Sequence, residues 1–256
     1  MSRNLCLVQA RLGSTRLPGK VLKSVGKTTI LGYQIKRLKL AKLINKIVVA
    51  TGDDHGNDHL AAYCRQIKIL CFRGSEADVL TRFYRCARAF PAYPNIIRVT
   101  GDCPLIDPAV VDQVINLFNK SRAAYGTNTL PPTYPDGMDI EIFTRAALAE
   151  AYRQANLLSE REHVTPYLRK NKKIKKVNLC APANFSHFRL TVDNQDDFDV
   201  IKFLINNSRP DATYLDYIAL LTKHPQIMFK NSHLTRNEGH LKSLKNDKKI
   251  KIKKES

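Results

Sequence analysis

The stretch that decides the fold is Asn4-Leu-Cys-Leu-Val-Gln9, followed directly by Ala10-Arg-Leu-Gly-Ser-Thr-Arg-Leu-Pro-Gly-Lys20. Its first part is an almost continuous apolar run, which is typical of a strand buried on both faces. The loop that follows holds two glycines, a proline, two hydroxyl side chains and three cations. Backbone amides freed by glycine, together with Arg and Lys side chains, suit a polyphosphate. We therefore predict a phosphate-binding loop at the end of the first strand.

Strand-like and helix-like segments alternate through the first half of the chain. Strands are expected at 5–9, 46–51, 69–72 and 95–100, and helices at 30–40, 58–66, 76–90 and 108–120. Short links between alternating strands and helices predict right-handed crossovers and a mostly parallel sheet with helices on both faces. Ligands bind such sheets at the carboxyl ends of the strands, where the 10–20 loop and the Gly101-Asp102 break both lie.

The second half is less regular and predicts a smaller mixed α/β elaboration of the same domain. Strands are expected at 123–127, 138–143, 174–180 and 188–192, and helices at 145–156, 160–170 and 196–207. At 256 residues, one domain is the default. We place that domain at 1–230. The remainder, 231–256, carries eight Lys or Arg against three acids and few apolar residues, so we expect a mobile, solvated tail.

Composition limits the function classes. No apolar run approaches the length of a membrane span, and the N-terminus lacks the layout of a secretory signal. The six cysteines show no C-x-x-C pairing, so we expect reduced thiols in a cytoplasmic protein and no zinc site. The net charge of +19 could serve nucleic acid, an anionic membrane surface or small anionic substrates. Nucleic-acid motifs are absent and aromatics do not interleave with the basic runs, so no specific nucleic-acid partner is expected.

Two aspartates follow predicted strands, and the first of them, Asp102, is a candidate ligand for a metal ion. Asp102 stands in Arg98-Val-Thr-Gly-Asp102-Cys-Pro, and Asp193 in Arg189-Leu-Thr-Val-Asp193-Asn-Gln-Asp-Asp197. Mg²⁺ is commonly held by one or two carboxylates together with substrate phosphates. The alternatives are a turn or cap role for Asp102 and an N-cap role for Asp193, whereas Asp107, which precedes Pro108, fits a helix cap better than a metal ligand.

The 10–20 loop is neither the common phosphate loop, which needs Ser or Thr where Val21 stands, nor the dinucleotide fingerprint. It resembles the signature of sugar nucleotidyltransferases that activate sugar acids with CTP, within them the group of spore coat polysaccharide biosynthesis protein F and acylneuraminate cytidylyltransferases. The resemblance implies a Rossmann-like nucleotide-diphospho-sugar transferase fold. It implies a metal site at Asp102 and Asp193 and catalytic roles for Arg11, Lys20 and Asp102. The nucleotide would be bound by Ala10, Arg11, Gly13, Ser14, Arg16, Lys20 and Thr100.

Two further clusters are similar to segments that line the acceptor pocket in that family. They are Tyr134-Pro-Asp136-Gly-Met-Asp139-Ile-Glu141 and Ser159-Glu160-Arg-Glu162-His163. The resemblance implies acceptor contacts at Asp136, Asp139, Glu141, Glu162 and His163. The residues alone are equally consistent with structural roles. Pro135-Asp136-Gly137 is a good turn, the face bearing Asp139 and Glu141 could meet solvent, and a lone helical His is often structural.

The resemblance implies an Mg²⁺-dependent cytidylyltransferase. It would join CTP and a sugar acid of the nonulosonic-acid type to give a CMP-sugar and pyrophosphate for surface polysaccharide synthesis, and it could act as a homodimer. One alternative is a glycosyltransferase or nucleotide-sugar-binding protein of the same fold. Charge alone suggests another, a nucleic-acid-binding protein.

Overall fold

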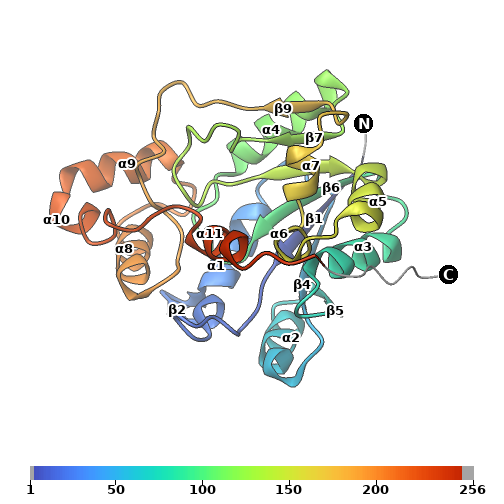
Figure 1. Ribbon diagram of the computed structural model, residues 1–256. Coiled ribbons are helices and arrows are strands. Elements are labelled where there is room, and N and C mark those ends of the chain that lie inside the picture. Colours follow the sequence, from blue (N-terminus) through green and yellow to red (C-terminus); the bar gives the residue numbers. More distant parts are fainter. Residues whose placement is uncertain (1–2, 250–256) are drawn as a thin grey trace.

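A seven-stranded sheet forms the centre of the molecule (Figure 1). The computed structural model describes residues 3–249, with strands in the order β5-β4-β1-β6-β8-β7-β9. Their bounds are Asn4–Gln9 (β1), Lys46–Gly52 (β4), Leu70–Gly74 (β5), Asn95–Thr100 (β6), Tyr125–Thr127 (β7), Glu141–Thr144 (β8) and Lys176–Asn178 (β9). A separate ribbon pairs Ser24–Val25 (β2) with Thr28–Thr29 (β3).

The strand pairing confirms a mostly parallel sheet. β1 lies between β4 and β6 and is parallel to both, and β5 continues parallel beyond β4. β8 runs antiparallel to its neighbours β6 and β7, whereas β9 is parallel to β7. The reversed strand marks the start of the mixed second half that the sequence predicts.

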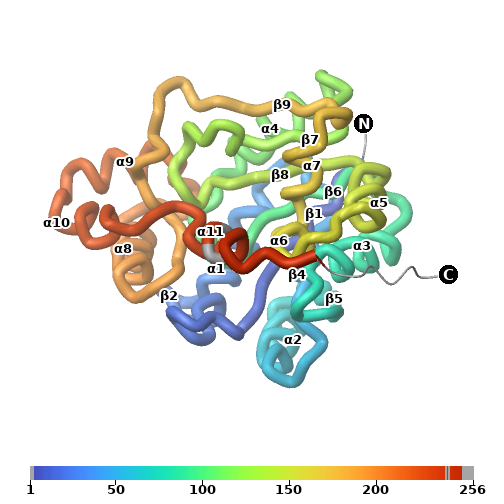
Figure 2. Tube along the Cα trace, viewed as in Figure 1, coloured from blue at the N-terminus to red at the C-terminus, as the bar shows by residue number. Residues whose placement is uncertain are grey.

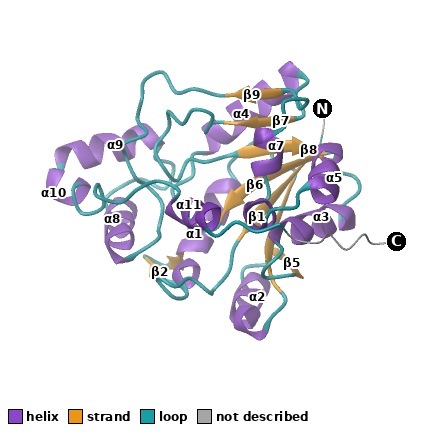
Figure 3. Cartoon of the chain, viewed as in Figure 1, coloured by secondary structure: helices purple, strands orange, loops and turns teal. Residues whose placement is uncertain are grey.

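Helices cover both faces of the sheet (Figure 3). The first half supplies α1 (Ile30–Leu38), α2 (Asp58–Gln66), α3 (Val79–Ala89) and α4 (Pro108–Ser121), with single turns η1 (Lys20–Leu22) and η2 (His55–Asn57). The second half supplies α5 (Arg145–Gln154), α6 (Leu158–His163), α7 (Pro166–Lys170), α8 (Gln195–Asn206), α9 (Tyr214–Lys223), α10 (Pro225–Met228) and α11 (Glu238–Lys245).

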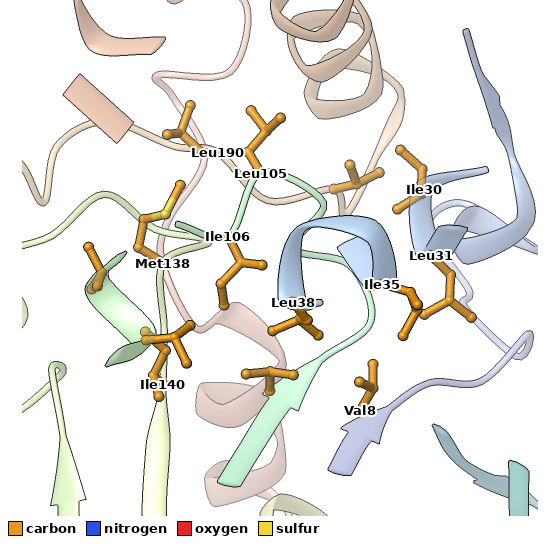
Figure 4. Close-up of a cluster of buried hydrophobic side chains, with 14 of the residues drawn as sticks. Val8, Ile30, Leu31, Ile35, Leu38, Leu105, Ile106, Met138, Ile140 and Leu190 are labelled. Atoms are coloured by element: carbon orange, nitrogen blue, oxygen red, sulfur yellow. The ribbon is translucent and has the colours of Figure 1, made fainter. Parts of the chain in front are cut away.

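Two apolar cores fill the space between sheet and helices. β1 contributes to both, because alternate side chains of a strand point to opposite faces. Val8 belongs to the same buried cluster as the apolar residues of α1 and the loop residues Met138 and Leu190 (Figure 4), whereas Leu5 and Leu7 belong to a second cluster with residues of α3 and α5. Burial on both faces explains why the residues of this strand between Asn4 and Gln9 are all apolar.

Three predicted elements of the second half differ in the structure. The segment 188–192 is no sheet strand, because its amides bond alternately to two loops: Leu190 donates to the Asp136 carbonyl and Val192 to the Asp102 carbonyl. The helix expected at 160–170 is two helices, interrupted at Val164, whose φ is 70°. The strand expected at 138–143 begins only at Glu141.

The segment 231–249 crosses the front of the molecule from α10 to α6 (Figure 2). Its Asn231 side chain is buried and donates to the Arg189 carbonyl and to Asp197 Oδ1. Asp247 accepts from the amide and hydroxyl of Ser159. A domain boundary at residue 231 stays a prediction, and residues 250–256 of the expected tail lie outside the described residues. The part that the structure describes nevertheless contacts the body through buried polar groups, which composition does not reveal.

None of the described helices has the length and apolar character needed to cross a membrane. The six cysteines are free thiols, with Cys6 in β1, Cys71 in β5 and Cys86 in α3 as expected.

Candidate active site

The ammonium of Lys20 lies between the two aspartates singled out by the sequence. Its Nζ donates to Asp102 Oδ2 at 2.6 Å, to Asp193 Oδ1 at 2.8 Å and to the Val192 carbonyl at 2.7 Å. These residues come from three segments separated by more than 80 positions. The structure thus brings together the cationic loop and both acids in one place.

Local structure explains why each group reaches this place. Gly19 adopts a left-handed conformation (φ 67°) that turns the loop into η1, where Lys20 is the first residue. Asp102 follows the end of β6, whose next residue, Gly101, donates its amide to the Gln9 carbonyl of β1. Asp193 precedes α8, which begins after the N-cap Asn194, so Asp193 itself is not the cap.

Burial and neighbouring charges shift the pKa values of this cluster in opposite directions, and the neighbouring charges have the larger effect. Burial acts to raise the pKa of Asp102, but the Lys20 ammonium and its hydrogen bond outweigh it and hold that pKa at about 2. Burial likewise favours a higher pKa for Asp193, yet Lys20 and Arg16 lower it. For Lys20, burial acts to lower the pKa, and the two carboxylates raise it above its ordinary value. All three groups are therefore charged at neutral pH.

The 10–20 loop lines a cleft with the carboxyl ends of β1 and β6. All seven residues expected to bind nucleotide line this cleft together with Asp102 and Asp193, namely Ala10, Arg11, Gly13, Ser14, Arg16, Lys20 and Thr100. Arg16 bonds both Asp193 Oδ1, at 3.0 Å, and Glu238 Oε2, at 2.5 Å. The Ser14 hydroxyl accepts from the amide of Leu17, so it also stabilises the turn of the loop.

A second hollow adjoins the first and contains most of the expected acceptor contacts. Asp136, Asp139, Glu141 and His163 line it, and it shares Arg16, Asp102 and Asp193 with the nucleotide cleft. Glu162 does not line it; its carboxylate accepts from the Ser243 hydroxyl of α11. The side chain of His163 bonds the same hydroxyl at 3.0 Å.

Glu141 does not face solvent. It is buried, and it bonds Arg98 at 2.5 Å, the hydroxyl of Tyr125 at 2.5 Å and the hydroxyl of Thr165 at 2.7 Å. Burial acts to raise its pKa, but Arg98 and Arg169 together with these hydrogen bonds lower it. Glu141 is therefore a charged residue of the hollow whose carboxylate is held by hydrogen bonds. The sequence predicted Asp139 on the same strand as Glu141, but Asp139 precedes that strand.

The donor set suits a hard divalent cation that completes its coordination with substrate oxygens. Among the side chains that the structure describes, no group of three or more His, Cys, Asp or Glu is placed to hold a metal ion. Asp102 and Asp193 supply two carboxylates that share one ammonium and retain side-chain exposure of 22% and 24% toward the cleft. Two carboxylates plus phosphates are a common arrangement for Mg²⁺, so these residues fit such an ion.

Sequence reasoning missed several charged residues of the site. Arg98 and Arg169 line the acceptor hollow, and Arg189 bonds Asp136, Asp193 and Asp197 from behind it. Arg98 interrupts an otherwise apolar strand, and Arg189 lies in an apolar segment that ends in an aspartate. A charged residue within an apolar run was the sequence feature that could have identified both arginines. For Arg236 no such signal exists, because it lies in the basic C-terminal segment.

A mostly parallel α/β sheet, with a cationic loop after β1, Asp102 after β6 and Asp193 just before α8, defines the nucleotidyltransferase class. The family model for cytidylyltransferases matches residues 5–252. The chain belongs to this family.

Individual relatives are similar to this chain over most of its length. Spore coat polysaccharide biosynthesis protein SpsF of Bacillus subtilis is 35% identical over 88% of this chain and 96% of its own. An uncharacterized protein of Methanocaldococcus jannaschii is 34% identical over 89% and 94%. A cytidylyltransferase structure from Leptospira borgpetersenii superposes with a TM-score of 0.85 at 35% identity, covering 92% of this chain and 99% of that one.

Proposed function

We propose that this cytidylyltransferase joins CTP to a sugar acid, releasing pyrophosphate and forming a CMP-sugar for surface polysaccharide synthesis. The observation that carries the proposal is the pair of adjoining hollows that share Arg16, Asp102 and Asp193. One hollow is bounded by a cationic loop suited to a triphosphate, and the other by polar and charged side chains suited to a sugar. The shared residues stand where two such ligands would meet.

The names of related proteins favour the same chemistry. SpsF is named for spore coat polysaccharide biosynthesis. A partial relative from Shewanella piezotolerans, 29% identical over 48% of this chain and 51% of its own, is named 8-amino-3,8-dideoxy-manno-octulosonate cytidylyltransferase. A fold neighbour with a TM-score of 0.60 is a CMP:2-keto-3-deoxy-manno-octonic acid synthetase complexed with CTP. We carry the sugar-acid acceptor to this chain on these grounds. The cytoplasmic location and the homodimer expected from the sequence stay predictions.

In the proposed reaction, an acceptor oxygen attacks the α-phosphorus of CTP. The new phosphorus–oxygen bond forms as the bond to the bridging oxygen breaks, pyrophosphate leaves and the acceptor hydroxyl loses its proton. Arg11, Arg16 and Lys20 would bind the phosphates, assisted by Ser14 and the amides around Gly13. Positioning and charge neutralisation dominate such transfers, so the protein needs no covalent intermediate.

Asp102 and Asp193 are the residues that would hold a divalent cation, for which we propose Mg²⁺. When bound, the ion would supply charge neutralisation at the phosphates. A mycobacterial fold neighbour, at 18% identity and a TM-score of 0.55, was solved in complex with manganese. Measuring activity while the concentration of Mg²⁺ or of Mn²⁺ is varied would distinguish between these two ions.

The test is pyrophosphate release from purified protein given each of the four nucleoside triphosphates, Mg²⁺ or Mn²⁺, and a panel of 2-keto sugar acids. Release with CTP and one acid supports the proposal. Consumption of a UDP-sugar without pyrophosphate release would favour the glycosyltransferase alternative. Arg11→Lys is expected to lose most activity, because a lysine cannot replace the paired hydrogen bonds of a guanidinium to phosphate.

A further inference from the structure

The acceptor hollow is rich in acid, although its proposed ligand is an anion. Six carboxylates line it, against three guanidinium groups from Arg16, Arg98 and Arg169. A carboxylate ligand in such a hollow would be repelled unless each acid on the wall has a cation of its own. The partners of those acids therefore decide whether a sugar acid can enter.

Two of the three acids on the acceptor side have partners within the body of the domain. Glu141 is paired with Arg98 at 2.5 Å, and Asp136 with Arg189 at 2.6 Å. Arg189 is shared, since it also bonds Asp193 and Asp197. Within residues 3–249, the one ion pair found for Asp139 is with Arg236, in the C-terminal segment.

Arg236 is built into this position. Its Nη2 donates to Asp139 Oδ1, its Nη1 donates to the Tyr134 carbonyl at 3.1 Å, and its Nε lies 3.7 Å from Asp136 Oδ1. The side chain is only 15% exposed and does not line the hollow itself. The Nε is buried without a hydrogen-bond partner, so the group is oriented toward the two acids rather than toward solvent.

The segment that carries Arg236 is anchored on both sides. Upstream, buried Asn231 bonds Arg189 and Asp197. Downstream, Glu238 pairs with Arg16, and Ser243 of α11 bonds Glu162 and His163 of α6. Figure 1 shows α11 beside α6 at the front of the molecule. The segment is thus fixed against both hollows.

We propose that Arg236 is a positioning residue that sets the acceptor specificity of the site: by neutralising Asp139 and Asp136 from behind, it lets an acid-lined hollow accept an anionic sugar. This inference rests on the proposed function for its choice of ligand. It gives a role to the basic C-terminal segment, which composition alone predicts to be a mobile, solvated tail. Burial and repulsion from Asp139 raise the pKa of Asp136 to about 7, and burial and repulsion from Glu141 raise the pKa of Asp139, whereas Arg236 acts on both carboxyls in the opposite direction.

The test compares Arg236→Gln with Arg236→Gln/Asp139→Asn. Binding of N-acetylneuraminate and of 3-deoxy-manno-octulosonate is measured by calorimetry with CTP present, and Michaelis constants for CTP and for the acid are measured separately. Arg236→Gln should weaken binding of the acid at least about tenfold, because an unpaired carboxylate then faces the ligand. The Michaelis constant for CTP should change less than twofold. The double variant should regain most of the lost affinity, since it removes that carboxylate.

Arg209→Gln is the matched control, because it removes one cation from a side chain that is 76% exposed and lines neither hollow. It should leave the affinity for the acid and the Michaelis constant for CTP unchanged. Equal loss of acid binding in the single and double variants would overturn the proposal, since Arg236 would then only hold the segment in place. Wild-type protein that binds neither acid would also overturn it. Binding without pyrophosphate release would instead refute the proposed function and leave this inference standing.

Discussion

The Nζ of Lys20 donates a 2.6 Å hydrogen bond to Oδ2 of Asp102, joining the first loop of the chain to the end of β6. Both side chains are largely buried, with exposures of 11% and 22%. This contact links the stability of the fold to the chemistry of the site, because removing Lys20 leaves the Asp102 carboxylate unpaired in a partly dry environment.

Lys20→Met should cost both stability and activity. It leaves Asp102 without the one cation that pairs with it among the described residues, so we expect the free energy of unfolding to fall by about 3 kcal/mol. Pyrophosphate release should fall at least about 100-fold, because a group that we propose binds the reacting phosphates is lost. Urea unfolding and steady-state kinetics measure the two effects.

Adding Asp102→Asn to that variant separates the effects. The double variant should regain most of the stability, because no unpaired carboxylate remains, but none of the activity. If activity returned together with stability, Lys20 would have only a structural role.

The stability of the wild type should fall as the pH drops below 4. The folded-state pKa of Asp102, about 2, lies below the ordinary value of 3.8, so the unfolded state binds more protons between those values. The stabilisation is complete above pH 4 and is lost as the pH falls toward 2, by about 2 kcal/mol in all. Urea midpoints measured from pH 6 to pH 3 should decline less steeply in Asp102→Asn than in wild type. Parallel curves would show that the Lys20 contact does not perturb this carboxyl.

Glu238→Gln should lower the Michaelis constant for CTP. Glu238 pairs with Arg16, which lines the nucleotide cleft, so the carboxylate competes with a triphosphate for the guanidinium. Both side chains are about one-third exposed, so we expect a change of only about two- to fivefold. Asp211→Asn, a loss of one charge at a carboxylate that is 73% exposed, is the control. A higher constant in Glu238→Gln would mean that Glu238 aids nucleotide binding.

Gly137→Ala should destabilise the protein and weaken acceptor binding. Gly137 has a φ of 99°, and a Cβ there would lie 2.4 Å from the Leu190 carbonyl oxygen. We expect a loss of at least about 2 kcal/mol, because backbone strain and a clash with backbone combine. The same change at Gly239, where a Cβ meets nothing within 4 Å, should be tolerated in thermal unfolding. Equal effects at the two glycines would contradict this account of the 136–139 turn.

Elements with a strong periodic pattern could be predicted from the sequence. β6 and α2 have the predicted bounds, and the Asp107 cap is confirmed by its bond to the Ala109 amide. The segment 188–192 looked like a strand because burial alone makes an extended segment apolar, whatever its hydrogen-bond partners. The break at Val164 could not be predicted, since a positive φ at a β-branched residue is imposed by its surroundings.

The site was predictable where its residues follow strand ends. Lys20 and Asp102 converge because the parallel strands β1 and β6 place their carboxyl ends at one edge of the sheet, whereas Asp193 reaches them through a loop whose Val192 amide donates to the Asp102 carbonyl. The contacts of Arg236 with Asp139 and of Glu238 with Arg16 were not predictable, because both residues lie in a basic segment whose composition is that of a solvated tail. Specific long-range pairs hold it in place, and composition carries no information on such pairs.

The central claim is that the adjoining hollows bind CTP and a sugar acid around Lys20, Asp102 and Asp193. The most direct measurement is pyrophosphate release by the wild-type protein with CTP, Mg²⁺ and a 2-keto sugar acid, each omitted in turn. The account predicts release only when all three are present, with CTP preferred over the other nucleoside triphosphates. Release that does not depend on the sugar acid, or no release with any acid of the panel, would contradict it.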